Sequence, residues 1–275
     1  MTLPVTGQTT VAGIIGDPVA HSRSPAIHNA AYAALGLDWT YVAFRVAPGT
    51  VGAALAGLRT LHVAGCNVTM PHKREAAEAC DELAVTAAAL GVVNTVVVRD
   101  GRLVGDSTDG AGFVDAAREA GVALTGVALL VLGAGGAARA IVHAVAGPTA
   151  RLRVAARRPD AAAAVAALAP GTAPVPFDEL DDAVAASDVV VNATPLGMHG
   201  EAPPFATDRL TPHHVVFDTV YAPSETPLLA AARARGAQAV NGLGMLVHQA
   251  ARSFVLITGR DAPLEIMWAA ARDDR

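Results

Sequence analysis

The strongest constraint on the fold is an apolar run that ends directly in a glycine-rich turn. Residues 127–132 are wholly apolar, and Gly133-Ala134-Gly135-Gly136-Ala137-Ala138 follow at once. A short apolar run bounded by glycine is typical of a central strand in a parallel sheet, and the small residues after it permit a tight turn into a helix. Strand and helix patterns alternate through residues 113–242 around this unit. The alternation predicts a doubly wound parallel sheet.

The glycine turn, residues 133–138, matches the pattern G-x-G-x-x-G/A, with Ala138 in the third position. In such a turn the first glycine allows the sharp bend, the second lets a pyrophosphate approach the backbone, and the small third residue lets the helix pack on the strand. The helix that follows offers unpaired N–H groups and a partial positive charge to the phosphates. The turn therefore predicts a dinucleotide site in a Rossmann-like domain, formed by Gly133, Ala134, Gly135, Gly136 and Ala137.

The end of the next predicted strand distinguishes the two common dinucleotides. A domain that binds NAD usually places Asp or Glu about 20 residues after the turn, where it binds the ribose 2′-hydroxyl. This chain has Arg157-Arg158-Pro159 there, and the first acid is Asp160. Two guanidinium groups suit a 2′-phosphate through charge-assisted bonds, although a solvated basic turn would have the same sequence. We therefore expect NADP rather than NAD.

The rest of the chain predicts a second domain. Residues 1–112 show further strand and helix patterns, including a hairpin at 94–104. Two helical patterns at 243–258 and 264–271 have no strands of their own, so we expect them to pack on the first domain. The 275 residues thus predict two α/β domains: residues 1–112, completed by 243–275, and residues 113–242.

The composition limits the classes of partner. The net charge is −5 and no Lys/Arg-rich run stands out, so no nucleic-acid binding is expected. No apolar stretch is long enough to cross a bilayer, so no membrane association is expected. Cys66 and Cys80 fit neither a disulfide framework nor a metal site, and the histidines lack metal-ligand spacing. We expect a cytoplasmic protein without a bound metal.

Clusters of polar residues in apolar surroundings recur outside the glycine turn. They are 16–29 (GDPVAHSRSPAIHN), 67–73 (NVTMPHK), 91–95 (GVVNT), 105–110 (GDSTDG) and 242–250 (GLGMLVHQA). Their order and approximate spacing, together with the glycine turn, resemble the shikimate dehydrogenase family along essentially the whole chain. The chain departs at two places. Ala156-Arg157-Arg158 stands where the family often has Asn-Arg-Thr, and Ser107 stands where it often has Asn.

The resemblance implies a role for each matching residue. The catalytic pair corresponds to Lys73 and Asp109. The residues that hold the substrate correspond to Ser22, Ser24, Thr69, Lys73, Asn94, Asp109, Tyr221 and Gln249. The residues near NADP, beyond the glycine turn and the two arginines, correspond to Thr194, Gly197, Met198, Gly244 and Met245.

Several of these residues have a structural alternative. Lys73 taken alone is typical of a solvated lysine at the start of a helix. Asp109 and Ser24 each stand where a side chain caps a helix N-terminus, and Gln249 fits a plain polar helix face. Oxidation of a secondary alcohol nevertheless needs an acid/base to handle the proton while a nicotinamide takes the hydride, and Lys73 suits that task.

The resemblance implies the reversible, NADPH-dependent reduction of 3-dehydroshikimate to shikimate, a step of chorismate and aromatic amino acid biosynthesis. Two other functions remain open from the sequence. One is a related dehydrogenase that acts on quinate or an aminoshikimate, and the other is a non-catalytic NADP-binding regulator with the same fold. The expected partner is a small molecule, and either a monomer or a homodimer is compatible with the sequence.

Overall fold

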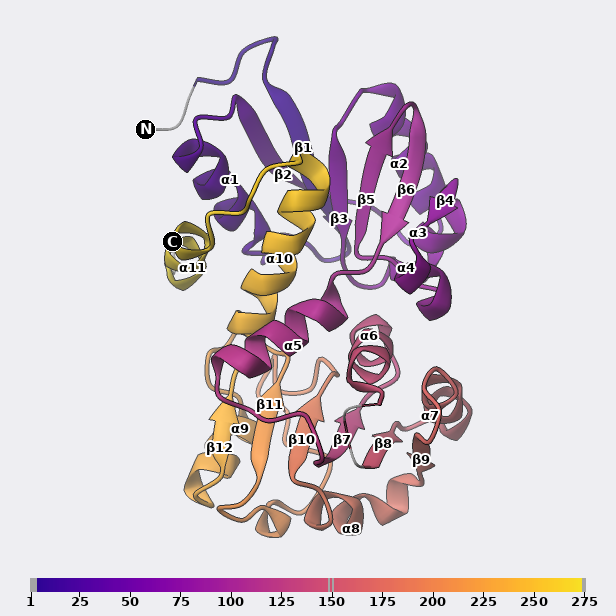
Figure 1. Cartoon of the computed structure of the whole chain (residues 1–275), viewed down its shortest axis with the longest axis vertical. Coiled ribbons are helices and arrows are strands. Elements are labelled where there is room, and N and C mark those ends of the chain that lie inside the picture. The colour runs from indigo at the N-terminus through magenta and orange to yellow at the C-terminus, as the bar shows by residue number, and fades with distance from the viewer. Residues whose placement is uncertain (1–3, 148, 150, 274–275) are drawn as a thin grey trace. The chain divides into compact units, whose positions relative to one another are not determined.

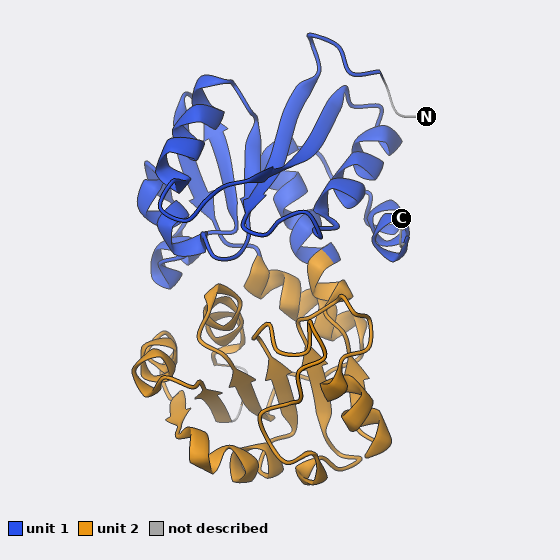
Figure 2. Cartoon of the chain, turned by 180° about the vertical axis from the view of Figure 1, so that it is seen from behind, with its two compact units in different colours: residues 1–108, 247–275 blue, residues 109–246 orange. Residues whose placement is uncertain are grey.

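A computed structural model describes residues 4–147, 149 and 151–273. The chain divides into two compact units, coloured separately in Figure 2. Unit 1 comprises residues 1–108 and 247–275, and unit 2 comprises residues 109–246. The predicted α/β architecture with two domains is confirmed. We predicted domain boundaries after residues 112 and 242, and the two units divide after residues 108 and 246.

Unit 1 is built on a six-stranded sheet with the strand order β2-β1-β3-β5-β6-β4 (Figure 1). Its strands are β1 (Thr10–Gly16), β2 (Trp39–Arg45), β3 (Gly65–Val68), β4 (Glu82–Leu83), β5 (Thr95–Arg99) and β6 (Arg102–Asp106). Its helices are α1 (Ser24–Ala34), α2 (Val51–Thr60), α3 (Lys73–Ala79), α4 (Val85–Leu90), α11 (Leu264–Arg272) and the larger part of α10 (Leu243–Thr258).

The strand directions of unit 1 bring several loops to one edge of its sheet. β1 pairs in parallel with β2 and β3, whereas β5 is antiparallel to both β3 and β6. The predicted hairpin is therefore confirmed as β5 and β6. The carboxyl ends of β1, β3 and β6 consequently meet at the same edge as the start of β5.

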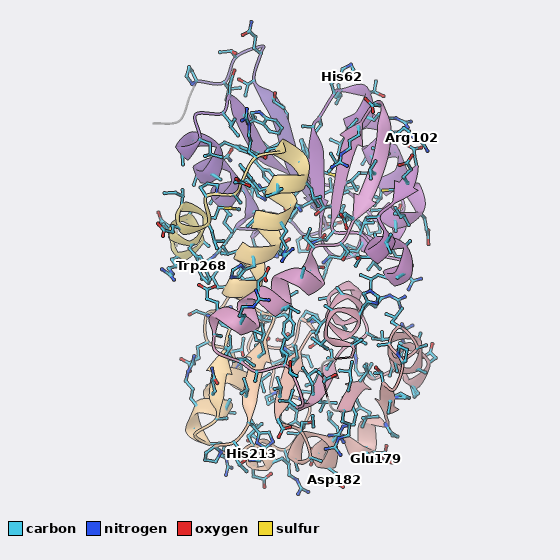
Figure 3. The ribbon with its side chains drawn as sticks, in the orientation of Figure 1. His62, Arg102, Glu179, Asp182, His213 and Trp268 are labelled. Carbon is cyan, nitrogen blue, oxygen red and sulfur yellow. The ribbon has the colours of Figure 1, made fainter. Side chains whose placement is uncertain are left out.

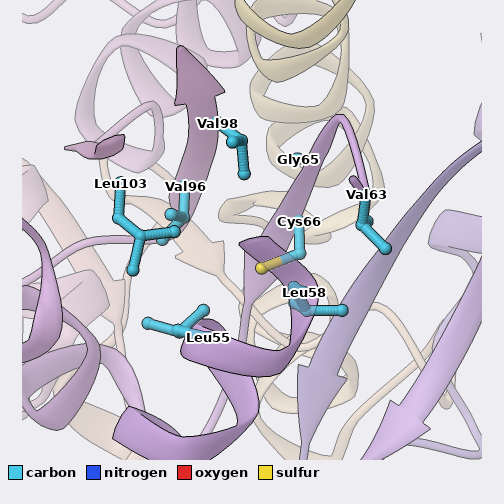
Figure 4. A pocket seen from close by; sticks show the side chains of 8 residues that line it. All are labelled: Leu55, Leu58, Val63, Gly65, Cys66, Val96, Val98 and Leu103. Atoms are coloured by element: carbon cyan, nitrogen blue, oxygen red, sulfur yellow. The ribbon is translucent and has the colours of Figure 1, made fainter. Parts of the chain in front are cut away.

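An apolar core lies between α2 and the sheet of unit 1. Leu55 of α2 is fully buried there with Ile15 and Val68 of the sheet. Figure 4 shows a small hollow in this core, with no room for a water molecule. The residues that line it are Leu55, Leu58, Val63, Gly65, Cys66, Val96, Val98 and Leu103. The lining is apolar, so this hollow belongs to the packing of the core.

Unit 2 is built on a six-stranded, wholly parallel sheet with the order β12-β11-β10-β7-β8-β9 (Figure 1). Its strands are β7 (Ala128–Leu132), β8 (Arg151–Ala155), β9 (Ala173–Val175), β10 (Val189–Asn192), β11 (Val215–Asp218) and β12 (Gln238–Val240). Its helices are α5 (Asp109–Glu119), α6 (Gly136–Val145), α7 (Pro159–Ala166), α8 (Leu180–Ala185) and α9 (Pro227–Ala234), with 3₁₀ turns at Phe177–Glu179 and Thr207–Arg209. This is the usual dinucleotide-binding strand order, whose direction of winding reverses between β7 and β10.

The apolar run before the glycine turn becomes a strand that is buried on both faces. Leu129 and Val131 of β7 pack into one core of unit 2, while Leu130 and Leu132 pack into another. Successive side chains of a strand point to opposite faces, so a central strand covered by helices on both sides needs apolar residues throughout.

The structure corrects several local predictions. The sequence patterns did not predict helix α9 or strands β4 and β12. Helix α9 does have a start signal, because Thr226 caps it by accepting from Leu229 N–H over 3.3 Å, and Pro227 follows Thr226. Ser24 does not cap α1: it is the first helical residue, and Arg23 precedes it without a side-chain cap. His213, labelled in Figure 3, is exposed, whereas His214 beside it is buried.

None of the helices in the described part of the chain has both the length and the apolar character that a membrane span requires.

Candidate active site

The sheet edge of unit 1 gathers the polar segments of the sequence. Thr69 N–H donates to the Ile15 carbonyl over 2.9 Å, and Asp17 N–H donates to the Met70 carbonyl over 3.0 Å. These bonds tie the loop after β3 to the loop after β1. Gly16 is needed at this contact, because a Cβ there would clash with Thr69 Cγ2. Thr69 is therefore fixed at the sheet edge, where it was expected to bind the substrate.

Lys73 is the first residue of α3, and its main chain is held from several sides. Val93 N–H donates to the Lys73 carbonyl over 2.9 Å, which joins α3 to the segment before β5. The preceding His72 is buried, with Nε2 2.7 Å from the Val46 carbonyl. The Glu75 carboxylate accepts from two N–H groups at the start of α2, over 3.1 and 3.0 Å. Lys73 thus stands on a short helix anchored by its neighbours, as a catalytic amine requires.

A group of polar side chains, here called the Asn94 cluster, lies at the same sheet edge. Its members are Asn67, Asn94, Thr95, Thr108 and Gln249. Asn94 Nδ2 donates to Thr108 Oγ1 over 2.9 Å and to Gln249 Oε1 over 3.2 Å. Thr108 N–H donates to Asn94 Oδ1 over 2.9 Å, and Thr108 Oγ1 donates to the Gln249 carbonyl over 3.1 Å. Helix α10 is thereby bonded to the ends of β5 and β6.

The two serines expected at the substrate lie at the start of α1. Ser22 is half-buried, and its Oγ accepts from Ser24 N–H over 3.2 Å. Ser24 itself is only 4% exposed. Arg23 between them donates to the Ala271 carbonyl over 2.7 Å, which fixes this turn against α11. Ser22 presents the more accessible hydroxyl of the pair.

Asp109 and Tyr221, the remaining residues expected at the substrate, belong to unit 2. Asp109 is the first residue of α5, where the helix dipole favours an acidic side chain. The next residue must be glycine, because a Cβ at Gly110 would clash with the Ala140 carbonyl oxygen of α6. The expected pairing of Asp109 with Lys73 joins residues of different units and stays a prediction.

The glycine turn of unit 2 lies at the reversal point of the sheet, between β7 and α6. Gly133 has φ +122°, and a Cβ there would lie 2.7 Å from the Ala193 carbonyl oxygen. Gly135 is exposed, and a Cβ there would meet no atom within 4 Å. Gly135 stands at the N-cap of α6 and has no side chain to cap the first N–H groups of the helix. This open turn has the form of a pyrophosphate cradle.

Arg157 and Arg158 follow β8, the strand next to β7 in the sheet. Both are exposed. Within the described residues, neither guanidinium takes part in a hydrogen bond or an ion pair. Two unengaged cations at the carboxyl end of the second strand match the place where a Rossmann-like domain recognises the adenosine ribose.

The loop after β10 is held by a buried carboxylate. Asn192 Oδ1 accepts from Thr194 Oγ1 over 2.6 Å, and Asn192 Nδ2 donates to Asp218 Oδ1 over 2.9 Å. Thr226 Oγ1 donates to Asp218 Oδ2 over 2.6 Å, and Gly197 packs against Thr226. Burial raises the pKa of Asp218, and these hydrogen bonds oppose the rise. The loop that carries Thr194, Gly197 and Met198 is therefore built into unit 2.

Gly244 and Met245 lie in the first turn of α10. Met245 is buried in an apolar core of unit 2 that also contains Val191 and Phe217.

No group of three or more His, Cys, Asp or Glu side chains that could hold a metal ion occurs in the described ranges.

Three family models and a curated relative match this chain. Residues 14–96 match the shikimate dehydrogenase substrate binding domain, residues 115–197 match the shikimate / quinate 5-dehydrogenase family, and residues 242–272 match the shikimate 5′-dehydrogenase C-terminal domain. A shikimate dehydrogenase (NADP(+)) from Symbiobacterium thermophilum is 46% identical over 277 residues, which cover 96% of this chain and 94% of that protein. The chain belongs to the shikimate dehydrogenase family.

Solved structures of the shikimate dehydrogenase family share the fold. Shikimate 5-dehydrogenase from Thermus thermophilus, in complex with NADP(H) and shikimate, is 35% identical with a TM-score of 0.87, covering 96% of this chain and 98% of that one. Quinate dehydrogenase from Corynebacterium glutamicum, in complex with NAD, is 33% identical with the same TM-score of 0.87, covering 95% and 98%. One of these two structures is thus named for shikimate and holds NADP(H), and the other is named for quinate and holds NAD.

Sequence reasoning did not give a role to the buried partners that hold these family motifs in place. In unit 1 they are Asn67 and Thr95, which support Asn94, and in unit 2 they are Asp218 and Thr226, which support the loop after β10. The available signal was a polar residue at the end or start of an apolar strand, where burial obliges it to find a hydrogen-bond partner.

Proposed function

We propose that this chain catalyses the reversible, NADPH-dependent reduction of 3-dehydroshikimate to shikimate, a step of chorismate and aromatic amino acid biosynthesis. The observation that carries the proposal is the Asn94 cluster, which shares one sheet edge of unit 1 with Thr69 and Lys73. A ring with several hydroxyl groups needs several fixed hydrogen-bonding side chains, and amides and hydroxyls supply them. The names of the relatives support the same substrate.

The substrate roles follow the chemistry of each side chain. Ser22 and Ser24 lie at the start of α1, where hydroxyls and helix N–H groups suit the ring carboxylate. Thr69, Asn94 and Gln249 offer neutral donors and acceptors that suit the ring hydroxyls. Tyr221 is proposed to border the bound ring from unit 2.

Lys73 is proposed to move the proton. When bound, NADPH supplies the hydride, which reduces the carbonyl carbon. The carbonyl oxygen must then gain a proton, and the Lys73 ammonium is a donor for it. In the reverse direction the neutral amine removes the proton from the substrate hydroxyl. Asp109, which follows Thr108 of the Asn94 cluster directly in the chain, is proposed as the second member of the catalytic pair.

Unit 2 is proposed to bind NADP. The glycine turn and the N-terminus of α6 suit the pyrophosphate, and Arg157 and Arg158 suit the 2′-phosphate. Thr194, Gly197, Met198, Gly244 and Met245 are proposed to lie around the nicotinamide half. The exposed turn at Gly135 and the two unengaged arginines support this assignment.

The test is the oxidation of NADPH followed by absorbance with 3-dehydroshikimate, with 3-dehydroquinate, and again with NADH in place of NADPH. We expect turnover to be fastest with 3-dehydroshikimate and NADPH. Faster turnover with 3-dehydroquinate would favour the quinate alternative, and a preference for NADH would remove the role of the arginines. No turnover of either acid, with NADPH still bound, would favour the non-catalytic regulator.

We propose a cytoplasmic location and a monomeric or homodimeric state, as expected from the sequence. Sedimentation of the purified protein tests the oligomeric state, and a tetramer or larger assembly would contradict it. Fractionation of the source cells tests the location.

A further inference from the structure

A hydrogen-bonded series of buried side chains leads from β2 to the Asn94 cluster. Tyr41 of β2 is 1% exposed, and its hydroxyl donates to Asn67 Oδ1 over 2.6 Å. Asn67 Nδ2 donates to the Asn94 carbonyl over 3.2 Å and to Thr95 Oγ1 over 3.1 Å. Thr95 Oγ1 donates in turn to Asn94 Oδ1 over 3.1 Å.

Chemistry fixes the direction of each bond in this series. The Asn94 carbonyl only accepts, so the amino end of Asn67 must face it. Asn67 Oδ1 then faces Tyr41, whose hydroxyl must donate. The Thr95 hydroxyl accepts from Asn67 and has a single hydrogen, which it donates to Asn94 Oδ1.

The series and Thr108 N–H together set the orientation of two amides. Asn94 Oδ1 accepts from the Thr95 hydroxyl and from Thr108 N–H, so Asn94 Nδ2 faces the other way. Asn94 Nδ2 donates to Gln249 Oε1 over 3.2 Å. Because the carbonyl end of Gln249 accepts this bond, its amino end turns away from Asn94.

We propose that Tyr41 and Thr95 are positioning residues that make Gln249 present N–H donors to the substrate. The group that Gln249 recognises is then an acceptor oxygen of the ring, a hydroxyl or the ketone. This inference rests on the proposed function, which assigns Gln249 to the substrate, because the inference names the class of substrate atom that Gln249 binds.

Neither of the two proposed positioning residues is accessible to a ligand. Thr95 is 0% exposed and Tyr41 is 1% exposed, so neither side chain reaches a ligand. Ser253 Oγ lies 3.5 Å from Asn67 Oδ1, at the outer limit of a hydrogen bond, and donates to the Ala250 carbonyl over 3.1 Å. Tyr41 is thus the short and well-directed donor to Asn67.

The same core offers a matched control. Tyr32 of α1 is also 1% exposed, and its hydroxyl has no hydrogen-bond partner in the described part of the chain. Both tyrosine rings lie near His28, whose ring stacks on Tyr41 at 4.3 Å and lies 6.2 Å from Tyr32. Tyr41→Phe and Tyr32→Phe therefore remove the same atom from one aromatic group, but only the first removes a bond to Asn67.

The experiment compares the kinetics and melting temperatures of Tyr41→Phe, Tyr32→Phe, Thr95→Val and Thr95→Ser with those of the wild type. We expect Tyr41→Phe and Thr95→Val to raise KM for shikimate roughly threefold to tenfold, the range for loss of one hydrogen bond, without changing KM for NADP⁺. Tyr32→Phe should leave KM at the wild-type value, and Thr95→Ser, which keeps the hydroxyl, should restore it. A lower melting temperature with an unchanged KM would overturn the inference.

A double-mutant cycle shows whether the effect passes through Asn94. In an Asn94→Ala background, Thr95→Val should no longer change KM for shikimate, because the amide that it orients is gone. An undiminished effect would overturn the proposal. The amide orientation is also observable without turnover, from the side-chain ¹⁵N–¹H signals of Asn94 and Gln249. Thr95→Val should shift both signals and Tyr32→Phe neither, so failure of this inference is distinct from failure of the proposed function.

Discussion

The candidate site of unit 1 and the candidate site of unit 2 are built from different kinds of atoms. In unit 1 the site consists of side chains, because Thr69, Lys73 and the Asn94 cluster supply amides, hydroxyls and an amine at one sheet edge. In unit 2 the site consists mainly of main chain, because the glycine turn offers N–H groups and an open surface. Under the proposed function, the side chains of unit 1 would select the ring, and Arg157 and Arg158 would select the coenzyme in unit 2.

The largest expected effect is at Lys73. Lys73→Ala should lower kcat by roughly 10²-fold or more with a milder change in KM, since a positioned acid/base contributes about 10²–10⁴-fold. Arg74→Ala is the matched control, because Arg74 is an exposed cation on the same helix. Initial rates with 3-dehydroshikimate and NADPH measure both variants, and a near-normal kcat for Lys73→Ala would remove this residue from its role.

The arginines test whether coenzyme selection depends on side chains in unit 2. Replacing Arg157 and Arg158 together by Ala should raise KM for NADPH roughly 10-fold to 100-fold, the range for lost bonds to a charged group, while sparing NADH. Arg151→Ala is the control, because Arg151 stands at the other end of β8 and donates to the Ala186 carbonyl over 2.6 Å. Equal effects on NADPH and NADH would refute the assignment of the 2′-phosphate.

His28 makes the stability of unit 1 sensitive to acid. Burial lowers the pKa of His28 from 6.5 to about 3, and neither ring nitrogen has a hydrogen-bond partner among the described residues. The unfolded chain binds the proton first, so stability is lost as the pH falls from 6.5 towards 3, by about 2 kcal/mol between pH 7 and pH 5. Urea unfolding at the two pH values measures the loss, and His28→Phe should reduce it.

Acid has the opposite effect on stability at Asp218 in unit 2. Burial raises the pKa of Asp218, so the folded chain binds this proton more readily than the unfolded chain, and acid favours the fold at this residue. Hydrogen exchange at pH 7 and pH 5 should therefore show greater acid-induced opening around His28 than around Asp218. Equal opening in both units would contradict the comparison.

The smallest expected difference between two matched variants concerns the backbone of the glycine turn. Gly133→Ala and Gly121→Ala both place a side chain at a positive φ, of +122° and +69°, but only Gly133 also faces a carbonyl oxygen at 2.7 Å. Gly121→Ala should cost about 1–2 kcal/mol of unfolding free energy, and Gly133→Ala about 1 kcal/mol more with a weaker affinity for NADPH. Urea unfolding and NADPH titration measure these changes. Identical behaviour of the two variants would show that the close contact is unimportant.

The two regions also differ in how far the sequence predicts them. The glycine turn, its strand and the arginine pair follow from local patterns, because backbone geometry imposes small residues at fixed spacing. The series from Tyr41 to Asn94 does not, because β2, β3 and β5 bring its members together only after the sheet has formed. Helix α9 could have been predicted from the sequence, since Thr226-Pro227 is a helix start. The edge strands β4 and β12 could not, because they have too few residues to show a strand pattern.

The most direct test is a crystal structure of the chain with shikimate and NADP⁺ bound. We predict that Thr69, Asn94 and Gln249 contact the ring, and that Lys73 Nζ and the Asp109 carboxylate both lie within about 3.2 Å of the reacting hydroxyl, which faces C4 of the nicotinamide. The pyrophosphate should lie on the glycine turn. A ring bound elsewhere, or Lys73 and Asp109 turned away from that hydroxyl, would contradict the proposed mechanism.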